Sequence, residues 1–232
     1  MIRPTDKANH PEPQVLLVDD DPVFLRAMRR LLEKYGYRAR TYESLEQLTK
    51  AGPVAQIGCA ILDLNLPGSD NGLDIQEKLR IAAPALSVVF LTGFARVPST
   101  VRAMKAGAVD FLEKPAGDEP LLAAIERAME RSRLVYDEVV ERSALRRNFA
   151  TLTQREREVF ALITSGLLNK QAAAELKITE KTVKFHRARL MAKMRVGSLA
   201  ELARAAERLA SGAEFVPGTF ALSASRASSR SG

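Results

Sequence analysis

Residues 57–63, Ile57-Gly-Cys-Ala-Ile-Leu-Asp63, decide how the N-terminal part of this 232-residue chain folds. The first six form an apolar run with the length of a buried strand, and Pro67-Gly68 predicts the loop that leaves it. Asp63 therefore stands at the carboxyl end of a buried strand, where open α/β sheets place their functional sites. We interpret Asp63 as the residue that the N-terminal part of the chain positions.

Three further apolar runs end in polar residues of complementary chemistry. The runs and the residues that follow them are 15–18 with Asp19, Asp20 and Asp21, 88–91 with Thr92, and 109–112 with Lys114. The carboxyl ends of parallel strands meet at one edge of a sheet, so these acids, the hydroxyl and the ammonium should gather around Asp63. The sequence therefore predicts one polar site assembled from four strand ends.

Strands and helices alternate along residues 14–130. Strands are expected at 14–18, 37–41, 57–62, 87–91 and 109–112. Helices are expected around Phe24, after Glu43 or Ser44, from about Gly72, after Val97-Pro98 to Gly107, and beyond Asp118. Short connections of this kind require right-handed crossovers and a parallel sheet. We predict a doubly wound, five-stranded α/β sheet in the flavodoxin-like order 2-1-3-4-5. Because no Gly-rich loop follows the first strand, dinucleotide binding is disfavoured.

Apolar residues at helical spacing predict which side of each helix faces the sheet. The inward residues are expected to be Phe24, Met28, Leu31 and Leu32; Leu73, Ile75, Leu79 and Ile81; and Leu121, Leu122, Ile125 and Met129. The single cysteine, Cys59, lies inside an apolar strand, which favours a small core side chain over a reactive thiol.

Charge divides the chain into unequal halves. Residues 1–132 carry 17 Lys and Arg against 18 Asp and Glu, a net charge of −1, whereas residues 133–232 carry 18 against 10, a net charge of +8. A basic half favours a polyanion such as nucleic acid as its partner. The chain has no apolar run of membrane-spanning length, and residues 1–13 lack a signal-peptide core, so we expect a cytoplasmic protein.

Four helices are expected in residues 151–210, at 153–165, 170–176, 180–194 and 198–209. Thr153 with Glu156, and Ser198 with Glu201, have the spacing of capping boxes, and Thr179 is the expected N-cap of the third helix. The connections 166–169 and 177–179 are short, as a helix-turn-helix requires.

The segments that flank this bundle are less regular. Residues 131–150 contain no Gly or Pro and predict a linker helix. A coiled-coil seam for dimerisation is an alternative there, although the heptad match is poor. Residues 1–13 and 211–232 show no periodicity, and we expect both to be disordered.

The helix expected at 180–194 has an apolar back and a basic front. Val183, Leu190 and Met194 form the inward stripe, and the opposite face carries Lys181, Lys184, Phe185 and Ala188 with Arg189 beside it. Such a helix suits the major groove of DNA, where Lys and Arg reach guanine edges and phosphates. Two interpretations of Phe185 stay open, contact with thymine methyls or packing on a neighbouring helix. His186 is interpreted as a packed or phosphate-contacting residue, because no second His or Cys lies nearby.

The predicted acidic site needs a cation, because Asp19, Asp20 and Asp63 would otherwise repel one another. Oxygen ligands select a hard cation such as Mg²⁺. A divalent cation and the Lys114 ammonium together neutralise a transferring phosphoryl group, and a carboxylate beside them can act as the nucleophile that forms an acyl phosphate. The alternative is that residues 19–21 only cap a helix and Lys114 is solvated; the agreement of four strand ends favours the site.

Residues 14–130 resemble the receiver domain of two-component response regulators. The resemblance rests on residues 15–21, Leu62-Asp63-Leu64, Leu91-Thr92-Gly93 and residues 106–115. It implies that Asp63 is the phosphoacceptor and that the metal ligands are Asp19, Asp20, Asp63 and the carbonyl of Asn65. It also implies that Thr92, Phe111 and Lys114 are the switch and phosphate-binding residues, and that the Lys114–Pro115 bond is cis. The loop 67–72 looks one residue longer than in this family, so dephosphorylation rate and partner choice could differ.

Residues 151–210 resemble the LuxR-type helix-turn-helix of NarL/FixJ response regulators. The resemblance rests on residues 152–159, 166–170 and 178–187. It implies an all-α, four-helix DNA-binding domain joined to a receiver of the flavodoxin/CheY-like fold. With the basic face described above, it assigns DNA contacts to Lys181, Thr182, Lys184, Phe185, Arg187 and Arg189.

We therefore predict a response regulator, not an enzyme, with a receiver at 14–130, a linker helix at 131–150 and a DNA-binding domain at 151–210. A partner histidine kinase phosphorylates Asp63, and the C-terminal domain binds promoter DNA as a homodimer. The dimer surface stays open among residues 97–112, the linker helix and the helix 198–209.

Two alternatives come from other classes. A Mg²⁺-dependent phosphatase or hydrolase is disfavoured, because no further acid stands near Asp63 beyond the metal pair and the helix-turn-helix would have no role. A regulator that uses its receiver only for docking is disfavoured, because Asp20, Asp63, Thr92 and Lys114 are all present.

Overall fold

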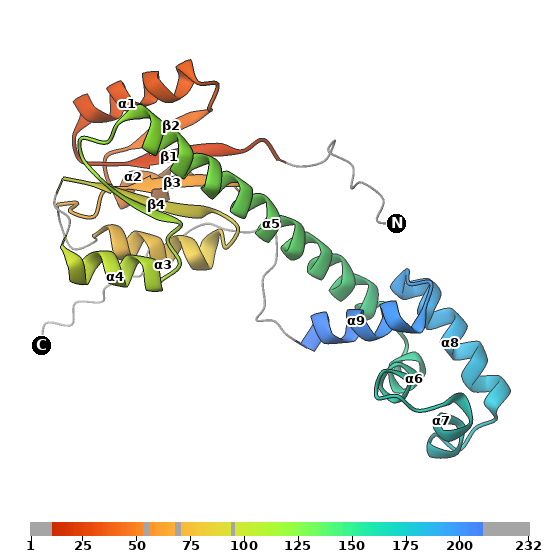
Figure 1. Ribbon diagram of the computed structural model, residues 1–232. Coiled ribbons are helices and arrows are strands. Elements are labelled where there is room, and N and C mark those ends of the chain that lie inside the picture. The colour runs from red at the N-terminus through yellow and green to blue at the C-terminus, as the bar shows by residue number, and fades with distance from the viewer. Residues whose placement is uncertain (1–10, 53–55, 68–70, 94–95, 211–232) are drawn as a thin grey trace, which may run out of the picture. The chain divides into compact units, whose positions relative to one another are not determined.

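The computed structural model describes residues 11–52, 56–67, 71–93 and 96–210 (Figure 1). Contacts divide the chain into two compact units, with the boundary between Asp137 and Glu138. The predicted disorder of residues 1–10 and 211–232 lies outside the described residues, as does the middle of the loop 67–72. None of the helices in the described ranges is both long and apolar enough to cross a membrane.

The first unit holds a parallel sheet in the order β2-β1-β3-β4-β5, which confirms the predicted topology. The strands are β1 Gln14–Val18, β2 Ala39–Tyr42, β3 Gly58–Leu62, β4 Ser87–Thr92 and β5 Asp110–Glu113. β2 begins two residues later than predicted. The cause is the turn after the first helix, in which Tyr37 N–H donates to the Leu32 carbonyl instead of joining the sheet.

Helices cover both faces of this sheet (Figure 1). They are α1 Pro22–Lys34, α2 Leu45–Lys50, α3 Gly72–Ala82, α4 Val97–Lys105 and α5 Asp118–Ala150. α2, α3 and α4 pack on one face, and α1 and the N-terminal part of α5 pack on the other. α5 runs without a break to Ala150, so the helix predicted for residues 131–150 is its continuation.

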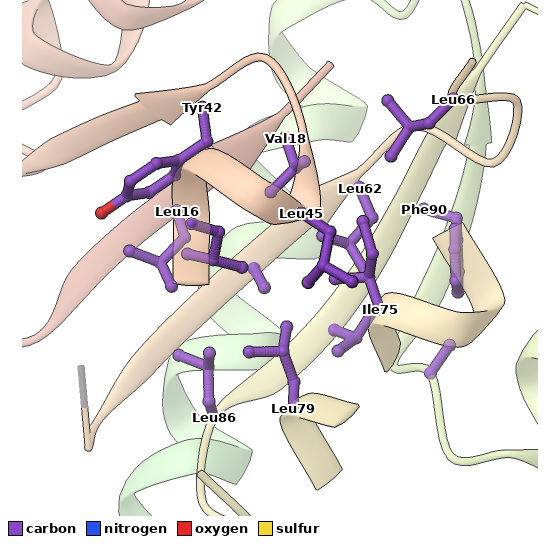
Figure 2. Packing of buried hydrophobic residues seen from close by; sticks show 14 of the residues in the cluster. Leu16, Val18, Tyr42, Leu45, Leu62, Leu66, Ile75, Leu79, Leu86 and Phe90 are labelled. Carbon is purple, nitrogen blue, oxygen red and sulfur yellow. The ribbon is translucent and has the colours of Figure 1, made fainter. Parts of the chain in front are cut away.

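The strands are buried on both faces, and alternate residues point to opposite layers, as the pleat requires. In one layer, residues of β1, β3 and β4 meet α2 and α3, as Figure 2 shows for Leu16, Leu62, Phe90, Leu45, Ile75 and Leu79. In the other layer, Leu17, Ile61 and Leu91 meet Leu32 of α1 and Ile125 of α5. Burial of each such side chain contributes roughly 1.5–3 kcal/mol, which fixes the sheet between its helices.

The expectation that Ile81 faces inward is wrong. Ile75 and Leu79 are buried four residues apart on one side of α3, whereas Ile81 is 61% exposed. A residue advances about 100° around a helix, so Ile81 is turned well away from the side that Leu79 buries.

The second unit contains α6 Gln154–Thr164, α7 Asn169–Glu175, α8 Glu180–Met194 and α9 Leu199–Ala210. Its core gathers buried residues from all four helices, namely Val159, Phe160, Ile163, Ala172, Val183, Leu190, Met194 and Leu202. The capping box of Thr153 and Glu156 is present as predicted. At α9 the Ser198 hydroxyl accepts from Glu201 N–H, as a capping box requires. The Glu201 carboxylate, however, accepts from Gly197 N–H instead of the Ser198 N–H that a capping box predicts.

Candidate functional site: an acidic sheet edge and a basic helix

The registers of the strands bring the predicted polar residues to one edge of the sheet. Val18 pairs with Leu62 and Leu62 pairs with Phe90, so that Asp19 and Asp63 follow neighbouring strand ends at the same level. Lys114 N–H donates to the Thr92 carbonyl at 2.8 Å, which joins β4 and β5 just before the site. The Lys114–Pro115 bond is cis, as expected.

The N-terminus of α3 lies in close contact with this edge of the sheet. Gly72 N–H donates to the Leu64 carbonyl, and a Cβ on Gly72 would lie 2.3 Å from the Asp63 carbonyl oxygen. Real Cβ atoms do not approach backbone that closely, so only glycine lets α3 begin beside Asp63.

The Lys114 ammonium is held between two buried carboxylates. Its Nζ donates to Asp63 Oδ2 at 2.9 Å and also to Asp19 Oδ2. Asp63 Oδ1 accepts from Asn65 N–H at 3.0 Å. Charge-assisted contacts of this kind fix both the position and the charge of the Asp63 carboxylate.

The two carboxylates respond differently to burial. Burial acts to raise the pKa of Asp63, but hydrogen bonds from Asn65, Lys114 and Thr92 outweigh it and leave the pKa below its usual value. For Asp19 burial wins over the bond from Lys114, and its pKa is raised. Burial would lower the pKa of Lys114, but its bonds to Asp19 and Asp63 raise it. Asp63 is therefore an anion, as a nucleophile needs to be.

The acidic cluster has the donor set of a metal site. Carboxylate oxygens of Asp19, Asp20 and Asp63 lie within 4.8 Å of one another. Asp21 does not belong to this cluster, because its Oδ1 accepts from Val23 N–H at 2.8 Å and caps α1. The helix-capping alternative therefore applies to Asp21 alone, and the remaining oxygens suit a hard cation.

Thr92 and Phe111 lie next to the acids. Thr92 is fully buried, and its Oγ1 accepts from Asn65 Nδ2 at 3.2 Å. Phe111 is half-buried, with its ring centroid 6.0 Å from that of Phe90. Asn65 is expected from the sequence to act through its carbonyl only, whereas its side chain also donates to Thr92.

Phe24 is a site residue that sequence reasoning missed. The Lys114 Nζ lies 4.1 Å from the centroid of the Phe24 ring, a cation–π distance. From the sequence, Phe24 is expected only to be an inward residue of its helix. Phe24 lies in the first turn of α1, three residues after the Asp21 cap, and this position places its ring over the strand ends. That spacing from the cap is the sequence signal that could have indicated its role.

The basic front predicted for α8 is present. Val183, Leu190 and Met194 are buried, and Lys181, Lys184, Phe185 and Arg189 are exposed. Phe185 is 56% exposed, with its ring centroid 5.6 Å from that of His186 and 5.5 Å from the Arg189 guanidinium carbon. These ring contacts are to its own helix, so the expected alternative of packing on a neighbouring helix is not what the described residues show, and the contact with DNA stays a prediction.

Two of the expected DNA-contacting residues, Thr182 and Arg187, are partly buried and hydrogen-bonded to protein groups. The Thr182 hydroxyl lies 2.8 Å from that of Thr179, and Thr182 N–H donates to the same oxygen as part of the α8 cap. Arg187 is half-buried, and its Nη1 donates to Asn169 Oδ1 at 3.2 Å, which ties α8 to α7. The other four expected DNA-contacting residues, Lys181, Lys184, Phe185 and Arg189, are exposed.

Glu156 fixes the basic helix against α6. It is buried, and its carboxylate accepts from Thr153 N–H at 2.8 Å and from Lys193 Nζ at 2.5 Å. Burial opposes the charge of Glu156, but the bonds from Lys193 and Thr153 lower its pKa to about 2. The capping-box spacing predicted the contact with Thr153; the ion pair with α8 joins residues 37 positions apart and leaves no local signal.

Both halves of the chain match known families. Residues 15–126 match the response regulator receiver domain, and residues 150–206 match the LuxR family of bacterial regulatory proteins. The response regulator protein TmoT of Ectopseudomonas mendocina is 38% identical over 202 residues, which cover 87% of this chain and 91% of TmoT. The tetrathionate response regulatory protein TtrR of Salmonella typhimurium is 40% identical over 195 residues, covering 84% of this chain and 92% of TtrR.

Solved structures agree across both halves. The response regulator StyR matches with a TM-score of 0.73 and 38% identity, covering 85% of this chain and 100% of StyR. Full-length FixJ from B. japonicum matches with a TM-score of 0.51 and 32% identity, covering 86% of this chain and 98% of FixJ. Since these relatives span the receiver and the DNA-binding part together, the chain belongs to the response regulators that join a receiver domain to a LuxR-type helix-turn-helix, a family of transcription regulators rather than enzymes.

Proposed function

We propose that phosphorylation of Asp63 by a partner histidine kinase controls promoter DNA binding through α8. The observation that carries the proposal is the Asp63 carboxylate, held ionised 2.9 Å from the Lys114 ammonium at a strand end. We assign residues 14–130 to the receiver, 131–150 to a linker helix and 151–210 to the DNA-binding domain. Because its DNA partner lies in the bacterial cytoplasm, we expect the protein to act there.

The chemistry is transfer of a phosphoryl group from a phosphohistidine. An Asp63 carboxylate oxygen attacks phosphorus, a P–O bond forms and the P–N bond breaks, and the histidine nitrogen keeps the electron pair and takes up a proton. The Lys114 ammonium pairs with a phosphoryl oxygen, which stabilises charge in the transition state. Asn65 N–H and Lys114 hold the carboxylate before the attack, so little reorganisation is needed.

We further propose that the cation of this site is Mg²⁺. The residues fit it, because Asp19, Asp20 and Asp63 supply only oxygen atoms and cluster within 4.8 Å. The Asn65 carbonyl is the expected fourth protein ligand. When bound, Mg²⁺ neutralises the phosphoryl oxygens.

The response is proposed to pass through Thr92 and Phe111. Phosphorylation adds about two negative charges at Asp63, close to the Thr92 hydroxyl. Thr92 then exchanges its bond from Asn65 for the phosphoryl group, and Phe111 occupies the space that it vacates. The surface of α4 and β5 changes shape and favours a homodimer, for which the exposed Val97, Val101 and Met104 of α4 offer an apolar patch. Val97, Val101 and Met104 lie at helical spacing on one side of α4, whereas the exposed apolar residues of the linker helix, Leu134 and Val140, are six positions apart and α9 offers Leu199. The spacing favours α4 and β5 as the dimer surface.

The test is DNA binding by the full chain with and without acetyl phosphate and Mg²⁺. We expect the donor to increase affinity for a two-half-site operator, with weak binding remaining without it, because the active state is populated to a small extent before phosphorylation. Asp63→Asn should abolish acid-labile phosphate incorporation and the donor response, because an amide is a poor nucleophile. Unchanged labelling of Asp63→Asn would contradict the assignment.

A further inference from the structure

Gln76 is a polar residue in the apolar layer between α3 and α4. Its side chain is 3% exposed, and its Nε2 donates to the Ala103 carbonyl of α4 at 3.2 Å. Within residues 11–52, 56–67, 71–93 and 96–210, no group donates to its Oε1. One end of the amide is therefore tied to α4, and the other end is a buried acceptor without a protein donor.

The arrangement seen here does not depend on this amide. The Ala103 carbonyl also accepts from Ala108 N–H at 3.1 Å, in the turn where Gly107 adopts a φ of 94° and ends α4. That carbonyl would stay satisfied without Gln76. A leucine of similar size would fill the same space and bring no buried acceptor, so packing alone does not explain a glutamine.

α4 is lightly held on the unit. Among its nine residues only Ala103 is buried, while Val97, Val101 and Met104 are exposed. The N-cap residue of α4, Arg96, makes no capping hydrogen bond to the first turn through its side chain. Elements with few buried apolar contacts open most easily, so a single buried amide beneath α4 can change how firmly the helix is held. That contact lies at the C-terminal end of α4, just before the strand that carries Phe111 and leads to Lys114.

We propose that Gln76 is a positioning residue that keeps α4 poised between two arrangements. In the arrangement seen here, Nε2 pins the end of α4 while Oε1 lacks a protein donor. In a displaced arrangement the bond from Nε2 is lost, but Oε1 becomes accessible to water. The opposing effects hold the two arrangements close in free energy, so a small bias is enough to move α4. The inference that movement of α4 affects signalling rests on the proposed phosphorylation of Asp63.

Two substitutions test the balance between the two ends of the amide. Gln76→Leu removes both the Nε2 donor and the orphan acceptor and keeps the volume. Because the Ala103 carbonyl still accepts from Ala108 N–H and an apolar side chain gains nothing from exposure to water, α4 should be held more firmly. Gln76→Glu keeps the shape but, at a pH where its carboxyl is ionised, replaces the donor with a second acceptor that repels the Ala103 carbonyl, so α4 should be released. Gln47→Leu makes the same change at an exposed position on α2, where the amide only accepts from Glu43 N–H, and serves as the control.

The measurement is amide hydrogen exchange of the α4 peptide in the full chain, without a phosphodonor. We expect exchange in α4 to slow by about tenfold in Gln76→Leu and to accelerate by about tenfold in Gln76→Glu, with α1 unchanged in both. Unchanged or faster exchange of α4 in Gln76→Leu would overturn the proposal. If that variant does not fold, Gln76→Met tests the same expectation.

A second readout tests the link to signalling. The acetyl phosphate concentration that gives half-maximal DNA binding should rise several-fold in Gln76→Leu and fall in Gln76→Glu. Slowed exchange of α4 with an unaltered donor response would overturn the link to Asp63. A wild-type chain that ignores the donor would instead count against the proposed function, while the exchange comparison, made without donor, would still decide the role of Gln76.

Discussion

Replacing Glu156 with glutamine should destabilise the second unit in a pH-dependent way. The substitution keeps an oxygen that can accept from Thr153 N–H, so the cap of α6 survives. What it removes is the buried negative charge that Lys193 binds at 2.5 Å and that Arg189 approaches at 3.9 Å. The two helices joined by this ion pair, α6 and α8, carry much of the core of the unit.

The magnitude follows from the pKa of Glu156, which lies at about 2 against an ordinary value of 4.5. At about 1.36 kcal/mol per unit, the difference corresponds to about 3 kcal/mol. The side chains of Lys193 and Arg189 are 29% and 60% exposed, so solvent screens part of the attraction, and we expect about 2 kcal/mol.

The sign of the pH dependence follows from the lowered pKa. A carboxyl group whose pKa is lower in the folded protein stabilises the fold at pH values above its unfolded pKa. That stabilisation is lost as the pH falls towards its folded pKa. The difference in unfolding free energy between wild type and Glu156→Gln should therefore have its full value of about 2 kcal/mol at pH 7 and about half that value near pH 3.

The assay is urea unfolding of the full chain, followed through the methyl NMR signals of Val183 and Leu190, which lie in the core of the second unit. Glu158→Gln is the matched control, since it removes a carboxylate of α6 that binds Arg155 at a partly exposed site. We expect that control to cost less than about 1 kcal/mol at any pH. Equal effects of the two substitutions, or a Glu156→Gln effect that does not shrink at pH 3, would refute the reasoning.

Three further predictions concern the two sites. Asp20→Ala should weaken Mg²⁺ binding in calorimetric titration more than Asp21→Ala, because Asp20 belongs to the acidic cluster whereas Asp21 caps α1; equal losses would contradict this choice. Thr92→Ala should incorporate phosphate from a donor yet show a reduced gain in DNA binding, and a full gain would argue against the proposed coupling. Lys184→Ala should weaken DNA binding by about 1–3 kcal/mol and relax the base preference at one operator position. Arg189→Ala should weaken binding to all DNA sequences alike and reduce the slope of log affinity against log salt concentration by about 1. Anisotropy titrations on cognate and scrambled operators at two salt concentrations test both expectations.

The sheet was predictable because its determinants are local. Apolar runs such as residues 57–62 are buried on both faces, and their spacing leaves room only for short crossovers. The strand order and the meeting of Asp19, Asp63, Thr92 and Lys114 followed from these runs. The same periodicity failed at Ile81, where an apolar side chain near the end of α3 points to solvent.

What the sequence did not predict depends on contacts between distant residues. The cation–π contact of Phe24 with Lys114 joins the start of α1 to the end of β5, and the ion pair of Glu156 with Lys193 joins two helices. Gln76 shows the same limit, since nothing around it in the sequence indicates that its amide reaches Ala103. Pairings of this kind are set by packing after the elements form, and a single sequence carries no local pattern for them.

The contacts of α8 indicate which of its basic side chains can move to a DNA phosphate or base without loss of a contact that stabilises the fold. Lys184 is paired with Glu180 at 2.9 Å, but both side chains are exposed, and such pairs contribute little and exchange readily for another anion. Arg189 lies 3.9 Å from Glu156, which is buried, yet Lys193 is the closer partner and keeps that carboxylate satisfied if Arg189 leaves. Arg187, by contrast, is half-buried and donates to Asn169, so moving it to a phosphate would break the connection between α7 and α8. Lys184 and Arg189 can therefore bind DNA at small cost to the fold, and Arg187 serves better by holding the two helices in position.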